Sequence, residues 1–328
     1  MELSVKTRTH KIGGGVSLIT IIVLIIMIVA GLYAYIDYQA DLQANKSMMA
    51  MVDDAKMQGV DLSYDTVDSS PLTRSVTVSN FKIKSNEQEP DIILGKLVIS
   101  GLDWQAFSTK KKDHLPLSMS IDITDGKIIL DDNMIENDPN LQSFVDVMGK
   151  ELHFSIHASY SLDEKTGVLT ALIQQSVNDN FRIKADMALG NTGWLAYVKT
   201  DESVLSDDLT LDLLATTLNN FSITFNNTGL IEKLRAVASK QSGLSEKRLI
   251  QQAVTQLRQI QSEFHNYSPV YSLMIEEIIK FTQRPNQLLI SIDPEQPLTS
   301  DDFLKVFIGK QSNPFDLMKK AQLFIRAN

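Results

Sequence analysis

The sequence contains no cysteine and only two tryptophans among its 328 residues. The absence of thiols excludes disulfide bonds and thiolate metal sites, and it is compatible with an oxidising compartment. Basic residues are also in the minority, because 31 Lys and Arg face 40 Asp and Glu, for a net charge of −9. Nucleic-acid binding requires a clustered basic surface, so we expect no nucleic-acid partner.

The sequence also lacks the motifs of catalytic and metal sites. His153 and His157 have the spacing of a helical metal pair, but they lie in an alternating strand pattern, where they would be about 13 Å apart. The acidic run 131–138 lacks the residue order of a calcium loop, since Ile135 occupies the third ligand position, and we interpret it as a polar loop. The sequence therefore predicts a protein that is not an enzyme and holds no metal or cofactor.

One long apolar run is present near the N-terminus. Residues 12 to 36 contain no charged side chain, and about 20 helical residues suffice to cross a bilayer core. A cleaved signal peptide is the alternative, but the run exceeds the usual ~7–15 residues and no small-x-small cleavage site follows it. We predict a transmembrane helix, with these membrane-anchor positions: Val16, Leu18, Ile22, Leu24, Ile26, Val29 and Leu32.

The charges on either side of the anchor predict its orientation. Lys6, Arg8 and Lys11 precede it, whereas Asp37 and Asp41 follow it. Because basic flanks remain in the cytoplasm, we predict a cytoplasmic tail of residues 1 to 11 and a single-pass topology with the remainder outside. Residues 37 to 58 lack Pro and Gly, which indicates a helical stalk with either a solvated surface or one face in contact with a neighbour.

From residue 59 onward the apolar period changes to two, which is typical of strands with one buried face. About ten such strands, joined by short turns, predict an antiparallel sheet. Asp125-Gly126 has the composition of a hairpin turn, and Asn178-Asp179-Asn180 indicates another. Residues 91 to 102 are apolar on both parities and predict a strand covered on both faces. Residues 194–199 predict a short strand, and 209–225 one long strand or two.

The period becomes helical in the last third of the chain. Thr228 can cap one helix, Pro269 opens another, and Thr299 with Asp302 matches the spacing of a capping box. We interpret residues 228 to 328 as a lid. The predicted fold is therefore α+β: an anchor and stalk, then a domain of residues 59 to 328 in which a large curved antiparallel sheet carries C-terminal helices on its apolar face.

Three segments, 59–67, 76–83 and 93–99, follow the anchor with regular strand and turn spacing. Together with the basic tail and the anchor, they resemble the opening of AsmA-like and YdgA-like bacterial envelope proteins, over about residues 12 to 130. The resemblance implies a curved sheet with an apolar concave face, located in the periplasm and attached to the inner membrane. It also implies a role in lipid handling or envelope maintenance.

Two functional hypotheses follow. In the first, the apolar sheet face binds membrane lipid without covalent chemistry. In the second, the protein is an accessory or scaffold subunit of an envelope or secretion complex and contacts another envelope membrane protein. Lys110, Lys111 and Lys112 are candidate contacts for anionic headgroups, with a solvated turn as the alternative. The candidate apolar groove consists of Phe154, Ile156, Phe181, Ile183 and Met187.

Overall fold

The computed structural model describes residues 42–57, 60–70, 73–84, 90–101, 116–197, 207–264, 269–307 and 314–328. The predicted tail, the predicted anchor at 12–36 and Lys110 to Lys112 lie outside these ranges. Within them, no helix combines the length and the apolar character needed to cross a bilayer.

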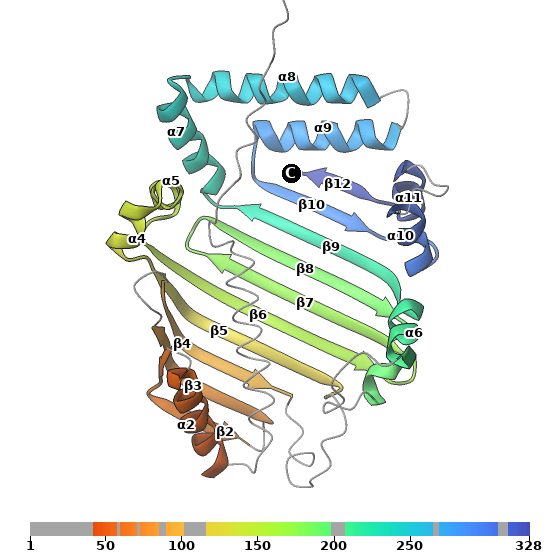
Figure 1. Cartoon of the computed structure of the whole chain (residues 1–328). Helices are drawn as coiled ribbons and strands as arrows, with labels where there is room; N and C mark the ends of the chain where they lie inside the picture. Colours follow the sequence, from red (N-terminus) through yellow and green to blue (C-terminus); the bar gives the residue numbers. More distant parts are fainter. Residues whose placement is uncertain are drawn as a thin grey trace, which may run out of the picture.

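The described strands form one twelve-stranded antiparallel sheet (Figure 1). They are β1 Asp61–Ser63, β2 Thr66–Ser70, β3 Ser75–Lys84, β4 Asp91–Ser100, β5 Ser118–Ile129, β6 Glu151–Asp163, β7 Val168–Val177, β8 Phe181–Gly190, β9 Thr217–Asn227, β10 Gln287–Ile292, β11 Leu298–Thr299 and β12 Phe324–Ala327. The order in space is β1-β3-β4-β5-β6-β7-β8-β9-β10-β12, with β2 on β3 and β11 on β9. The predicted antiparallel sheet is confirmed.

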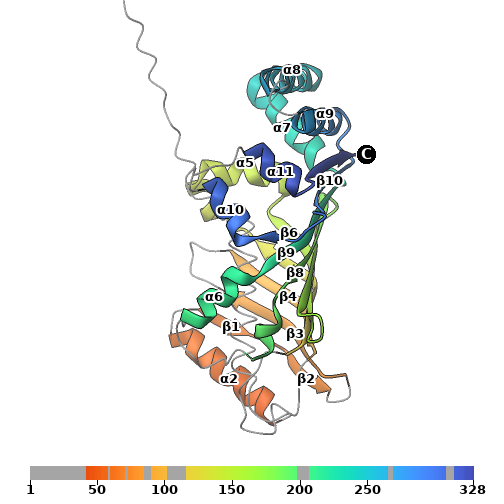
Figure 2. The ribbon, with the colours of Figure 1, turned by 90° about the vertical axis from the view of Figure 1, so that its right-hand side faces the viewer.

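Helices connect the strands and flank the sheet. They are α2 Leu42–Met57, α4 Asp132–Asn137, α5 Pro139–Met148, the 3-10 helix η1 Gly193–Tyr197, α6 Asp207–Ala215, α7 Leu230–Ser242, α8 Glu246–Phe264, α9 Pro269–Gln283, α10 Ser300–Phe307 and α11 Pro314–Lys320. In Figure 2, α2, α5, α6, α10 and α11 all lie on one side of the sheet. This is the side of the apolar face, because Met48 of α2 packs within the core cluster there.

In strands β3 to β5 the buried residues change between even and odd numbers at one row, while the same face of the sheet stays buried. In β3 the buried side chains are even-numbered up to Val78 and odd-numbered from Phe81. The change of parity occurs at Asn80. This residue lies opposite Gly95 of β4, and Gly95 lies opposite Asp125 of β5. Asn80 and Asp125 both have left-handed backbone angles, with φ of 50° and 53°. The row ends at β6, where the pairing shifts by one residue in a β-bulge.

This row explains two differences from the sequence prediction. Asp125-Gly126 is not a hairpin: β5 continues through it, because the positive φ of Asp125 is used for a bulge and not for a chain reversal. The prediction that the strand at residues 91–102 is covered on both faces is also wrong. The buried residues of β4 change from even-numbered at Leu94 to odd-numbered at Leu97, so one face is buried throughout.

Several helices replace predicted loops and strands. The acidic run 131–138 contains the short helix α4 and the N-cap of α5, because Asp131 and Asp138 accept hydrogen bonds from the backbone N–H of Asn133 at 2.7 Å and of Asn140 at 2.8 Å. Residues 207–215 form α6, so the strand predicted within 209–225 begins only at Thr217. Residues 193–197 form η1 in place of a strand.

The predicted helix caps have mixed outcomes. Thr299 and Asp302 form the expected capping box, with Thr299 N–H donating to Asp302 Oδ2 at 2.9 Å and Asp302 N–H to Thr299 Oγ1 at 3.4 Å. The Thr228 cap is wrong, because Asn227 supplies the side-chain acceptor for the N–H of Ile231 at 2.9 Å. Asn227 lies at the end of β9, so the same residue closes the strand and opens α7.

The C-terminal helices cover the apolar face only in part. Helix α9 packs on β12 and β10, and its Phe281 meets the Phe225 ring of β9 edge-on at 6.0 Å. Figure 1 shows α8 beyond α9, past the end of the strand order and away from β6 to β8. The helices predicted to pack on the apolar face therefore do so only in part, since α8 and α9 lie near the β10–β12 edge of the sheet.

Candidate functional site

The predicted groove residues lie on one face of the sheet but differ in exposure. Phe154 pairs across to Val177 and then to Phe181, while Ile156 and Ile183 lie in the next row. Phe154 and Phe181 are buried under α5 and α7 in the core cluster. Met187, two rows further along β8, is 36% exposed.

The centre of the apolar face forms a surface that we call the open platform. It consists of two neighbouring rows that run across strands β5 to β10: Ile121, Ala158, Ile173, Ala185, Ile223 and Ile290, and Met119, Tyr160, Ala171, Met187, Phe221 and Ile292. Ile173 is 41% exposed and most of the others are half-buried. None of these side chains is ionisable at neutral pH, and the hydroxyl of Tyr160 donates to the Pro116 carbonyl at 2.9 Å.

Helix α6 presents further apolar surface on the same side of the sheet (Figure 2). Leu211, Leu213 and Leu214 are 65%, 46% and 50% exposed. Exposed leucines on a short helix contribute little to the stability of the fold, because burial is the source of their stabilisation. Together with the open platform they mark this side as the apolar surface of the molecule.

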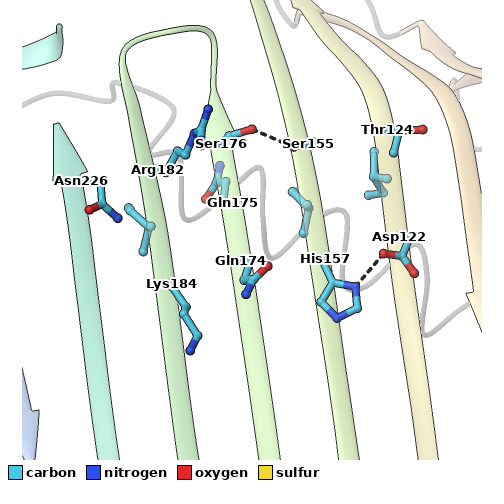
Figure 3. A pocket seen from close by; sticks show the side chains of 13 residues that line it. Asp122, Thr124, Ser155, His157, Gln174, Gln175, Ser176, Arg182, Lys184 and Asn226 are labelled. Carbon is cyan, nitrogen blue, oxygen red and sulfur yellow. Dashed lines mark hydrogen bonds and ion pairs between the residues drawn. The ribbon is translucent and has the colours of Figure 1, made fainter. Parts of the chain in front are cut away.

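The opposite face of the same strands is polar and carries a hollow of about 440 Å³. Figure 3 shows its side chains on β5 to β9. One row runs from Asp122 through His157 and Gln174 to Lys184, and the adjacent row runs from Ser155 through Ser176 and Arg182 to Asn226. We call this surface the polar hollow.

Two side-chain pairs tie neighbouring strands together in the polar hollow. His157 Nδ1 lies 2.6 Å from Asp122 Oδ1, and the hydroxyls of Ser155 and Ser176 are 2.7 Å apart. A histidine oriented by a carboxylate is also part of a hydrolytic triad, but that chemistry needs a nucleophile within reach of the other ring nitrogen. Over the described ranges no interaction joins His157 to a hydroxyl, and no cluster of His, Asp and Glu could hold a metal ion.

Lys184 points toward an acid outside the hollow. Its Nζ lies 3.1 Å from Asp186, which also accepts a hydrogen bond from the Ser222 hydroxyl at 2.5 Å. That hydrogen bond, followed by the contact with Lys184, lowers the pKa of Asp186 below its ordinary value. Asp186 is therefore ionised at neutral pH and offsets the charge of Lys184.

A chain of amides fixes Asn226 at the other end of the hollow. Asn328 donates to Gln287 Oε1 at 2.8 Å, and Gln287 Nε2 donates to Asn226 Oδ1 at 2.9 Å. Because its oxygen is already occupied, the free group of Asn226 is its NH₂. Figure 3 shows that this nitrogen is on the side of Asn226 that faces β8.

The sequence prediction missed the polar hollow. It placed His153 and His157 in an alternating strand pattern, and the structure confirms that alternation in β6. What it lacked was the register that sets His157 beside Asp122, 35 residues earlier in the chain. The alternation itself could have indicated a polar face. In the next two strands the polar positions alternate in the same way, at Gln174 and Ser176 in β7 and at Arg182 and Lys184 in β8.

The geometry defines an α+β protein built on a single large antiparallel sheet, with one apolar and one polar face. A protein-family model, described only as "Uncharacterized protein", matches residues 174–328, which extend from within β7 through α11 and β12. No curated protein matches the sequence.

Proposed function

We propose that this protein is anchored in the bacterial inner membrane by residues 12–36 and binds lipid acyl chains on the open platform in the periplasm, without covalent catalysis. The observation that carries the proposal is the half-exposed apolar surface across β5 to β10. The resemblance of residues 12 to 130 to AsmA-like and YdgA-like envelope proteins supports the same location and ligand class.

The dimensions of the open platform suit an acyl chain. From β5 to β10 there are five strand spacings, or about 24 Å at ~4.8 Å each, which is comparable to an extended fatty acyl chain. Burial of apolar surface is favourable by roughly 25 cal/mol per Å² and needs no directional contact. Exposed Ile173 and Met187 lie on adjacent strands β7 and β8, so a bound chain would cover both.

The lack of charge on the open platform supports an aliphatic ligand over a polar one. A headgroup or a sugar would need hydrogen-bond partners, and leaving polar groups unpaired costs free energy. The nearest polar side chain on this face, Gln175, is only 9% exposed. The polar part of a bound lipid would therefore lie outside the platform.

Native mass spectrometry of the full chain, purified in mild detergent, tests the proposal. We expect co-purified lipid on the wild type and at least a fivefold lower occupancy in the Ile173→Glu/Met187→Glu variant. Thr170→Glu is the matched control, because Thr170 lies on the same strand but on the opposite, exposed face. An empty wild type, or equal lipid loss in the control, would overturn the lipid proposal.

A second candidate function rests on α6. Its three exposed leucines offer a small apolar contact for another envelope membrane protein, as expected of an accessory or scaffold subunit. The same mass spectra separate the two functions. A stoichiometric protein partner that is lost in Leu211→Asp, with no lipid on the platform, favours the scaffold; lipid retained in Leu211→Asp favours the platform.

A further inference from the structure

The polar hollow contains more hydrogen-bond donors than acceptors, and Arg182 of β8 lies at its end beside the β7–β8 turn (Figure 3). We propose that this hollow is an oxyanion-binding site, which takes a carboxylate or phosphate group at the Arg182 guanidinium. The site is on the face opposite the open platform, so it is independent of the proposed lipid binding.

Arg182 has its donors free. Throughout the ranges that the structure describes, no hydrogen bond or ion pair engages its guanidinium. An arginine side chain carries five N–H donors in a planar fork, which matches the oxygens of a carboxylate or phosphate. Arg182 is exposed to solvent from the strand surface, so a ligand reaches it without any movement of the backbone.

The neighbours of Arg182 in its own row add donors. Ser176 and Asn226 are its cross-strand partners on either side, and such partners have Cβ atoms about 4.5–5.5 Å apart. The NH₂ of Asn226 faces β8 because Gln287 occupies its oxygen (Figure 3). The Ser155 and Ser176 hydroxyls share one hydrogen bond, so one hydroxyl hydrogen remains for a ligand.

The charges that surround the hollow favour a small anion. Asp122 is the only carboxylate among the residues that line it, and it lies against His157. Lys184 adds a positive charge that Asp186 offsets from outside. The adjoining hollow shares Ser155 and Ser176 but is lined by Asp125, Glu151 and Asp179. An extended polyanion would meet those acids, whereas a single oxyanion at Arg182 would not.

Calorimetric titration of the full chain in a neutral detergent tests this site. The probes are inorganic phosphate and, separately, sodium acetate, with chloride holding the ionic strength constant. Because the site is open to water, we expect dissociation constants of about 1 mM, weakened at least tenfold by Arg182→Gln and a few-fold by Asn226→Ser. Lys165→Gln removes a cation from the β6–β7 turn outside the hollow and should leave binding unchanged.

The outcomes separate the sources of the oxyanion. Binding to phosphatidylglycerol vesicles but not phosphatidylcholine vesicles, lost in Arg182→Gln, identifies a lipid headgroup phosphate. Binding of phosphate or acetate without vesicle binding identifies a free oxyanion. Absence of saturable binding of both small probes and of vesicles, or equal weakening by Arg182→Gln and Lys165→Gln, would overturn the proposal. Lipid occupancy of the open platform in Arg182→Gln should equal that of the wild type in either case.

Discussion

Phe81 and Ile173 both face the apolar side of the same sheet, yet Phe81 is completely buried and Ile173 is 41% exposed. The difference is cover. Met48, Val52 and Ala55 of α2 pack over β1 to β4, whereas no comparable helix packs over the described centre of β6 to β8. The first part of the sheet thus uses its apolar face as a core, and the second part presents it as a surface.

This comparison separates two roles that look alike in sequence. Apolar alternation shows which face of a strand is apolar, but it does not show whether another element covers that face. A covered row contributes to folding, while an open row is available to a ligand. The following changes test whether the two halves of the apolar face differ in this way.

The largest expected effect is from Phe81→Ala in the covered half. Removing a fully buried aromatic side chain costs about 3–5 kcal/mol, whereas Ile173→Ala in the open half should cost about 1 kcal/mol or less. Urea unfolding of both variants, followed by far-UV circular dichroism, measures the two losses. Similar losses in the two variants would show that the open platform is covered in solution.

The next largest effect concerns helix α2, which covers the first half of the sheet, and two adjacent methionines of this helix test its role. Met48 is 2% exposed and Met49 is 59% exposed. Met48→Ala should therefore destabilise the protein by about 2–4 kcal/mol, while Met49→Ala should change stability by less than about 0.5 kcal/mol. Thermal unfolding distinguishes them. If the two variants unfold alike, α2 does not act as the cover that separates the halves.

The sequence predicts the sheet well because its information is local. Alternation at Ile92 and Leu94 or at Phe181 and Ile183 sets strand identity, and the short polar turn at Asn178 sets antiparallel order. Long-range pairing is what the sequence does not show. The row of Asn80, Gly95 and Asp125 exists only once three strands are in register, and a single strand with an Asp-Gly pair looks like a hairpin.

The two surfaces differ in the same respect. Ile156, Ile183 and Met187 were predictable as members of one face because parity alone places them there. The polar hollow was not predictable, because its chemistry depends on contacts between strands. The sheet register brings Asp122 beside His157 and Gln287 beside Asn226. Exposure was also unpredictable, since it depends on where α2 and α9 pack.

Gly126 lies at the boundary between the halves, where the bulge begins. A Cβ atom there would lie 2.6 Å from the Phe154 ring, far inside contact distance. Gly126→Ala should cost about 1–3 kcal/mol through the strain of a crowded core. Gly193→Ala is the control, because a Cβ atom added at Gly193 would have its nearest neighbour 3.7 Å away. In a double-mutant cycle Phe154→Leu should recover part of the loss; strictly additive losses would contradict the contact.

The smallest effect is expected where the open half ends, at edge strand β12. The N–H of Ala327 donates to Glu277 Oε2 at 2.8 Å, and this bond, with the nearby Lys280, lowers the pKa of Glu277 below its ordinary value. Because the folded-state pKa is the lower one, the ionised carboxylate stabilises the fold above the ordinary pKa of glutamate, and this contribution is lost as the pH falls through the lowered value.

Glu277→Gln should therefore lower the urea midpoint slightly at about pH 7, and the difference from the wild type should vanish near pH 3. The effect is small because the side chain is partly exposed and its charge is screened by solvent. Glu164→Gln, in the β6–β7 turn, controls for the loss of one negative charge. A difference that persists unchanged in acid would mean that the carboxylate charge does not hold the edge of the open half.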